Sequence, residues 1–236
     1  MIAFVSNPCL PYRQFVALPS SGAETYLSLG PSTGRIMTLL PDRVGGVWLI
    51  GHPGPQQGEL RVQRTTMAGV PLPGWEQGVG LPVRDVVTTL NIALDSAGGL
   101  AFVWSDPSAP ATVRAFRLTP DGTPPPTWDP LGVVVTPVPA TAGAFASAPD
   151  GMDGAYVAWI DSRFQATTGQ DIYASRVLAD GSIDPTYVTG GRAVAINSPA
   201  HSRVMVVPTE PGAAIVVWDD YRNGNWDIYA QRLPLD

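Results

Sequence analysis

From Gly154 to Gly181 the chain reads GAYVAWIDSRFQATTGQDIYASRVLADG, and this stretch decides the fold because it returns near the C-terminus. The second version, from Gly212 to Asp236, reads GAAIVVWDDYRNGNWDIYAQRLPLD. Both contain W-x-D-x-R followed by D-I-Y-A-x-R. Such self-similarity predicts a repeat architecture, in which the rest of the chain consists of more diverged copies of one unit.

The residues before each repeated tryptophan form two β-rich runs joined by a turn. They read AFASAPDGMDGAYVAW (144–159), LNIALDSAGGLAFVW (90–104) and VMVVPTEPGAAIVVW (204–218). Turn-forming Pro, Asp and Gly between β-branched and aromatic flanks predict an antiparallel hairpin, strands A and B. The D-I-Y-A-x-R run predicts a strand C. A fourth apolar run, strand D, follows in three copies as LPV at Leu81, GVVVTP at Gly132 and GRAVAI at Gly191.

Five copies can be aligned along the chain, with boundaries near 2–34, 35–85, 86–139, 140–196 and 197–236. The first and last copies stop after strand C. Repeats of this length with four short strands are typical of a β-propeller, in which sheets pack on their neighbours. We therefore predict a single all-β domain, a β-propeller of five blades with three to four antiparallel strands each. The alternative is that the chain is part of a larger propeller.

The repeat resembles a known group of bacterial propellers. IAF-x-S near the start, the P-D-G turn and D-x-R-x-G-x-x-D-I-Y are similar to the TolB-type propeller repeat and the wider sialidase-like group. The resemblance implies an extracellular or cell-envelope protein. The five-bladed fold implies that a member that cleaves glycosides would place carboxylates from different blades around the channel mouth. The sialidase motif S-x-D-x-G-x-x-W is absent from the sequence, which argues against sialidase activity.

Composition excludes several partner classes. The 236 residues carry a formal charge of −6, and all 14 basic residues are scattered arginines. A nucleic-acid-binding face is therefore not expected. No apolar run reaches membrane-spanning length, so no membrane span is expected either. The single cysteine, Cys9, excludes an internal disulfide framework.

The W-x-D-x-R and D-I-Y motifs are interpreted as parts of the scaffold, because they recur from copy to copy. The aspartate is expected to bond turn amides, and the arginine to pair with it or with Asp171 and Asp227 across the hairpin. The residues assigned to this structural repeat are Trp104, Asp106, Trp159, Asp161, Arg163, Asp171, Tyr173, Trp218, Asp220, Arg222, Asp227 and Tyr229.

No metal or cofactor site is predicted. The run from Asp219 to Asp227 has enough oxygen atoms for Ca²⁺, and this is kept as an alternative, but its spacing departs from that of an EF-hand. An Asn-Gly turn at Asn223 explains the run equally well. The two histidines, His52 and His201, have no second ligand at zinc-site spacing.

No catalytic residue is predicted, because the presumed A strands contain no carboxylate. The main hypothesis is a non-catalytic module that binds a protein or glycan on its loops or interblade grooves. One alternative is a glycosidase-like enzyme at the channel mouth, and another is a structural segment of a larger secreted or surface assembly. The candidate binding residues are the polar groups before the A strands and the aromatic residues before strand D: Arg35, Arg84, Asp85, His201, Arg203, Trp75, Trp128 and Tyr187.

Overall fold

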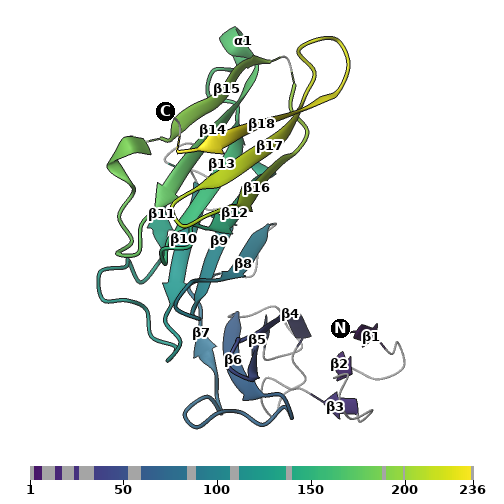
Figure 1. Ribbon diagram of the computed structural model, residues 1–236, viewed down its shortest axis with the longest axis vertical. Helices are drawn as coiled ribbons and strands as arrows, with labels where there is room; N and C mark the ends of the chain where they lie inside the picture. Colours follow the sequence, from purple (N-terminus) through teal and green to yellow (C-terminus); the bar gives the residue numbers. More distant parts are fainter. Residues whose placement is uncertain are drawn as a thin grey trace. The chain divides into compact units, whose positions relative to one another are not determined.

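The computed structural model describes residues 3–6, 14–17, 24–26, 35–52, 60–83, 89–106, 112–136, 140–187, 190–198 and 200–234. These residues form five sheets of three or four strands, and each sheet is built from consecutive strands in antiparallel order (Figure 1). The predicted all-β class and the succession of propeller blades are confirmed. The first and last sheets have three strands each, as the sequence predicts.

The chain divides into two compact units, Met1–Asp85 and Val86–Asp236. The first unit holds two sheets, whose strands are β1 (Ala3–Ser6), β2 (Gln14–Ala17) and β3 (Glu24–Tyr26), then β4 (Arg35–Pro41), β5 (Gly46–His52), β6 (Arg61–Thr66) and β7 (Val79–Gly80). Strand β7 occupies the two residues directly before the predicted LPV run, so that boundary was wrong. Leu81 instead donates its amide to the carbonyl of Leu60, just outside the strands.

The second unit holds the other three sheets. The first consists of β8 (Leu90–Leu94), β9 (Leu100–Asp106), β10 (Thr112–Leu118) and β11 (Val133–Val134). The next consists of β12 (Ala140–Pro149), β13 (Ala155–Asp161), β14 (Gln170–Val177) and β15 (Arg192–Ser198), and the last of β16 (Val204–Pro208), β17 (Ala214–Asp220) and β18 (Asp227–Leu233). Two short helical turns not predicted from the sequence are α1 (Gln165–Thr168) and η1 (Pro185–Tyr187). That the whole chain is one domain stays a prediction.

The turn between strands A and B is built in the same way in three sheets. In the β12–β13 turn, Asp150 accepts hydrogen bonds from the amides of Met152 and Gly154, each at 2.8 Å. Its second oxygen binds Arg176 of strand β14 at 2.7 Å. A Cβ at Gly154 would lie 2.2 Å from the carbonyl oxygen of Val177, so glycine is required. The same arrangement joins Asp42 with Arg64 and Asp95 with Arg117.

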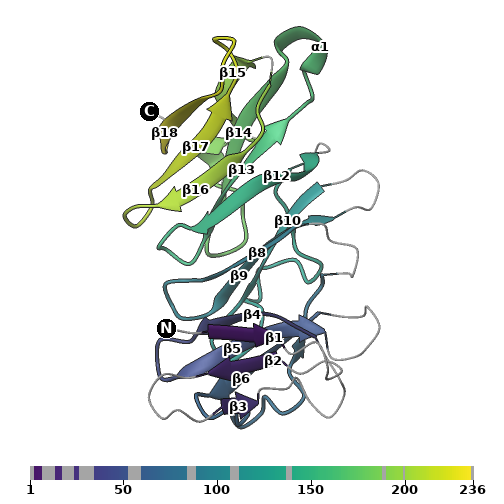
Figure 2. The same cartoon turned by 90° about the vertical axis from the view of Figure 1, so that its right-hand side faces the viewer.

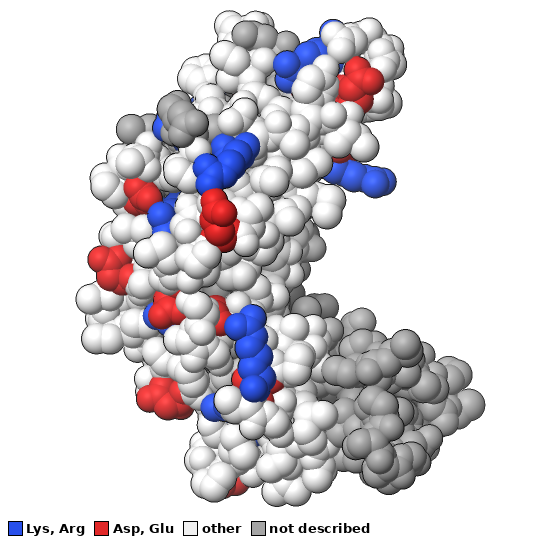
Figure 3. All heavy atoms as spheres, viewed as in Figure 1, with Lys and Arg blue, Asp and Glu red and all other residues white. Residues whose placement is uncertain are grey.

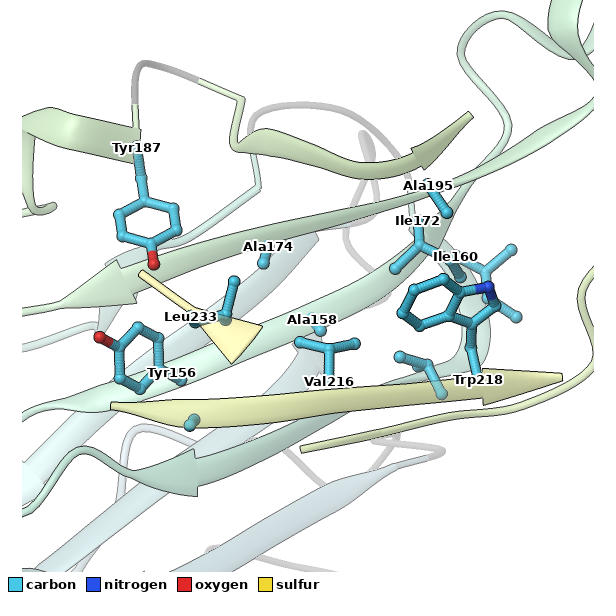
Figure 4. Packing of buried hydrophobic residues seen from close by; sticks show 12 residues of the cluster. Tyr156, Ala158, Ile160, Ile172, Ala174, Tyr187, Ala195, Val216, Trp218 and Leu233 are labelled. Carbon is cyan, nitrogen blue, oxygen red and sulfur yellow. The ribbon is translucent and has the colours of Figure 1, made fainter. Parts of the chain in front are cut away.

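The three sheets of the second unit pack face to face. Strand β12 lies against β16 on one side and β8 on the other, so the A strands of successive sheets are neighbours (Figure 2). Between the last two sheets, apolar side chains from both form one buried cluster (Figure 4). Its members include Tyr156, Ala158, Ile172, Ala174, Val216, Trp218 and Leu233. Burial of these faces holds the sheets in sequence, as expected for blades.

Within the described ranges, no helix is long and apolar enough to cross a membrane.

Candidate functional site

One end of the last sheet gathers several of the polar residues that the sequence singled out. In the last sheet Val204 pairs with Trp218 and Asp220 pairs with Asp227, so strand A begins where strand B ends and strand C begins. The amide of Tyr221 donates to the carbonyl of Ala200 at 3.2 Å and ties the two loops together. We call residues 200–203 and 219–227 the loop end of the last sheet.

The W-x-D-x-R motif forms a compact group of hydrogen bonds within strand β13 and the loop after it. We call this group, centred on the aspartate, a staple. Asp161 is fully buried and accepts hydrogen bonds from the Trp159 indole at 2.8 Å, the Arg163 amide at 2.8 Å and the Arg163 Nε at 2.9 Å. Burial raises the pKa of this carboxyl, but the bonds from Arg163 and Trp159 outweigh burial and leave the pKa lowered. The arginine therefore pairs with the aspartate of its own motif.

Strand β17 repeats this staple. Asp220 accepts from the Trp218 indole at 3.2 Å and from the Arg222 Nε at 2.8 Å. In both copies the guanidinium also lies over the tyrosine of strand C, at 4.2 Å from Tyr173 and 4.5 Å from Tyr229. In the sheet of β8 to β11, where the motif lacks its arginine, Asp106 binds Arg114 of strand C at 2.7 Å.

The three aromatic candidates are buried, which corrects their assignment as glycan contacts. Trp75, Trp128 and Tyr187 are 7%, 6% and 1% exposed. Trp75 packs edge-on against Trp48 at 5.2 Å. The Trp128 indole donates to the carbonyl of Ala179 at 2.9 Å, and its ring belongs to the buried cluster that includes Trp159. These rings fill the flanks of the sheets and cannot stack on a ligand.

His201 is also inside rather than on the surface. Its Nδ1 lies 3.0 Å from the carbonyl oxygen of Asp219 and 3.9 Å from Oδ2 of Asp220. Its ring is therefore part of the packing beneath the loop end, whereas Arg203 is exposed beside it. Arg35 begins strand β4, but its side chain lies outside the described residues, as do Arg84 and Asp85.

The structure identifies Asp219 as a candidate functional carboxylate, which the sequence analysis had considered only as part of the run from Asp219 to Asp227. Asp219 is partly exposed, and its Oδ2 accepts a hydrogen bond from Ser202 at 2.6 Å. Side chains alternate along strand β17, so Asp219 and the buried Asp220 point to opposite faces. Among the described residues, Asp219 forms no ion pair with an arginine. Consecutive side chains at the end of a strand point to opposite faces, and this alternation was the sequence signal that could have predicted different environments for Asp219 and Asp220.

The carboxylate oxygens of Asp220 and Asp227 in this run accept hydrogen bonds from protein donors. Asp220 binds Arg222, and Asp227 accepts hydrogen bonds from the Asn225 amide at 2.7 Å and the Asn223 amide at 3.2 Å. Over the part of the chain that the structure describes, no group of three or more His, Cys, Asp or Glu side chains could hold a metal ion. On the face shown in Figure 3, basic and acidic side chains adjoin one another rather than forming a patch of one sign.

No protein-family model matches the sequence, and no curated protein is significantly similar to it. Solved structures with a similar chain path include an α-L-arabinanase of Penicillium chrysogenum complexed with arabinobiose, 15% identical, with a TM-score of 0.44. This likeness covers 87% of the present chain and 62% of the arabinanase, so the chain spans less than two thirds of that enzyme.

Two further similar structures are also enzymes. The α-L-arabinanase of Cellvibrio cellulosa, complexed with arabinohexaose, is 12% identical, with a TM-score of 0.39 and coverage of 100% of this chain and 91% of that one. A puromycin hydrolase is 14% identical, with a TM-score of 0.36 and coverage of 100% and 46%. These descriptions run against the hypothesis of a non-catalytic binding module, which is therefore withdrawn. The likeness itself assigns no substrate or site to this chain.

Proposed function

We propose that this protein cleaves glycosides, with the reacting bond held at the loop end of the last sheet. The observation that carries the proposal is the environment of Asp219. It is a partly exposed carboxylate, oriented by Ser202, at the sheet end where the loop before strand A meets the loop after strand B. Asp220, the next residue, and Asp161, its counterpart in the preceding sheet, are held by arginines and are unsuited to proton transfer.

Glycoside hydrolysis commonly uses two carboxyl groups, one that protonates the leaving oxygen and one that acts as base or nucleophile. We assign Asp219 one of these two roles. The hydrogen bond from Ser202 fixes the direction in which the carboxylate points, which is what a proton-transferring or nucleophilic group requires. The substrate class suggested is a neutral polysaccharide such as arabinan or xylan.

The test is hydrolysis of arabino- and xylo-oligosaccharides, followed by the release of reducing ends. Asp219→Asn should abolish the release, since the amide cannot act as acid, base or nucleophile. Glu210→Gln is the matched control and should keep full activity, because this carboxylate lies in the turn at the opposite end of the same sheet, where it pairs with Arg232. Full activity of the Asp219 variant, or an inactive wild-type protein across the panel, would overturn the proposal.

We propose in addition that the protein works outside the cytoplasm, where polysaccharides occur, and that its repeat is related to the TolB-type and sialidase-like propellers. Both statements are supported by the sequence resemblance alone. Secretion of the full-length protein by its host, measured by fractionation, tests the first.

A further inference from the structure

The exposed aromatic rings of the last sheet gather on one hairpin. Tyr221 and Trp226 are 39% and 52% exposed, and their ring centroids lie 5.2 Å apart at an interplanar angle of 53°. The tryptophans of the scaffold, such as Trp159 and Trp218, are buried. Two neighbouring aromatic rings kept in water therefore stand apart from the rest of the sheet, and such patches commonly mark binding surfaces.

Polar groups with fixed directions border these rings. The Asn225 amide donates to Asp227 Oδ1, and the Asn223 amide donates to Asp227 Oδ2 and, at 3.0 Å, to the Tyr229 hydroxyl. These bonds use amide protons, which leaves the two Asn side-chain oxygens as hydrogen-bond acceptors at the surface. The hairpin thus presents an apolar platform beside an edge of acceptors.

Charge narrows the class of ligand. Arg222 is paired with Asp220 and lies over Tyr229, whereas the Asn223 and Asn225 amides that bond Asp227 carry no charge, so the hairpin is unsuited to an anionic ligand. A sugar ring combines an apolar C–H face with a rim of hydroxyl donors, which matches the platform and its edge of acceptors. The bond from the Tyr221 amide to Ala200 places the hairpin beside Ser202 and Asp219.

The geometry points to Tyr221 and Trp226 as a sugar-stacking platform that anchors a neutral glycan chain next to Asp219, with Asn223 and Asn225 binding its hydroxyls. The choice of a glycan rests on the proposed function. The equivalent hairpin of strands β13 and β14 offers a matched control, because it exposes the Phe164 ring at 51% and, among the residues that the structure describes, no second ring stacks on it.

The experiment is isothermal titration of the full chain with arabinohexaose, xylohexaose and cellohexaose. Trp226→Ala should weaken binding about tenfold or more, as is common for a stacked anchor residue, and Trp226→Phe should restore part of it. Phe164→Ala should leave binding unchanged. Circular dichroism of each variant checks that it is folded, as expected because the Trp226 and Phe164 side chains both lie on the surface.

The two proposals fail in different ways. If the wild-type protein binds none of the three hexasaccharides, or if Trp226→Ala binds as tightly as wild type, the platform is wrong, even where hydrolysis is observed. Binding of a proline-rich peptide to the same rings in place of a sugar would also overturn it. If binding depends on Trp226 but no bond is cleaved, the platform stands and the proposed hydrolysis is wrong.

Discussion

The sheet of β12 to β15 and the sheet of β16 to β18 carry similar hairpin sequences. Their equivalent faces nevertheless differ in burial. Ile172 on strand β14 is 0% exposed, whereas its counterpart Ile228 on β18 is 83% exposed. Ala148 is buried where Val207 is exposed. The buried face of the sheet of β12 to β15 packs against the sheet of β16 to β18, as Figure 4 shows.

The difference also reaches the turn between strands A and B. The turn of β12 and β13 is held by the buried Asp150, which binds Arg176. At the corresponding place in the last sheet, Arg232 binds Glu210, and both side chains are more than half exposed. The same local sequence pattern therefore builds the same hairpin, while burial and ion-pair strength depend on what packs against it. Four experiments can test this comparison, from the largest expected effect to the smallest.

The first experiment truncates the two equivalent isoleucines. Ile172→Ala should lower the free energy of unfolding by about 3 kcal/mol, because it removes buried methyl groups and leaves a cavity between two sheets. Ile228→Ala should change it by less than about 0.5 kcal/mol, since the side chain is exposed. Urea unfolding of both variants measures the difference, and equal losses would show that the two faces are equally covered.

The second experiment compares the two buried staples. Asp161→Asn should cost about 3 kcal/mol, because it leaves the Arg163 guanidinium without its carboxylate. Asp220→Asn should cost less, since Arg222 is more exposed than Arg163 and can be solvated. Thermal unfolding followed by tryptophan fluorescence gives both values. A larger loss for Asp220→Asn would reverse the order that the exposures predict.

The third experiment addresses the arginines of strand C. Arg176→Ala should lower stability by about 2 kcal/mol, because Asp150 stays buried without its cation. Arg232→Ala should cost no more than about 0.5 kcal/mol, since its pair with Glu210 is exposed to solvent. Chemical unfolding is again the measurement. A substantial loss for Arg232→Ala would mean that this surface pair is not screened as expected.

The smallest effect concerns pH. Burial raises the pKa of Asp184, but hydrogen bonds from Thr186 and the charge of Arg176 leave it lowered, and the pKa of Asp161 is lowered as well. Carboxyls with a lowered folded-state pKa stabilise the protein fully above their unfolded-state pKa, about 4. Stability should therefore be lost as pH falls below about 4, through the folded-state pKa values. Unfolding at pH 2 to 7 tests this, and Asp161→Asn should flatten the acid limb.

The sequence predicted much of the fold because the repeat is encoded locally. Alternating apolar residues, Asp-Gly turns and the W-x-D-x-R motif specify each hairpin without reference to its neighbours. The site was predicted less well. Trp75, Trp128 and Tyr187 were included among the candidate binding residues, since a single sequence does not show which flank of a sheet the next sheet covers. His201 was misplaced for the same reason.

By itself the sequence determined that this protein is built from five copies of an antiparallel unit, because turn chemistry and side-chain alternation act within a few residues. Only the tertiary structure decided which copies of a residue are buried and which meet solvent. Asp220 is held by an arginine while Asp219, one residue earlier, is partly exposed beside Ser202. That distinction depends on which face of strand β17 is covered, which is a property of sheet packing and not of the strand.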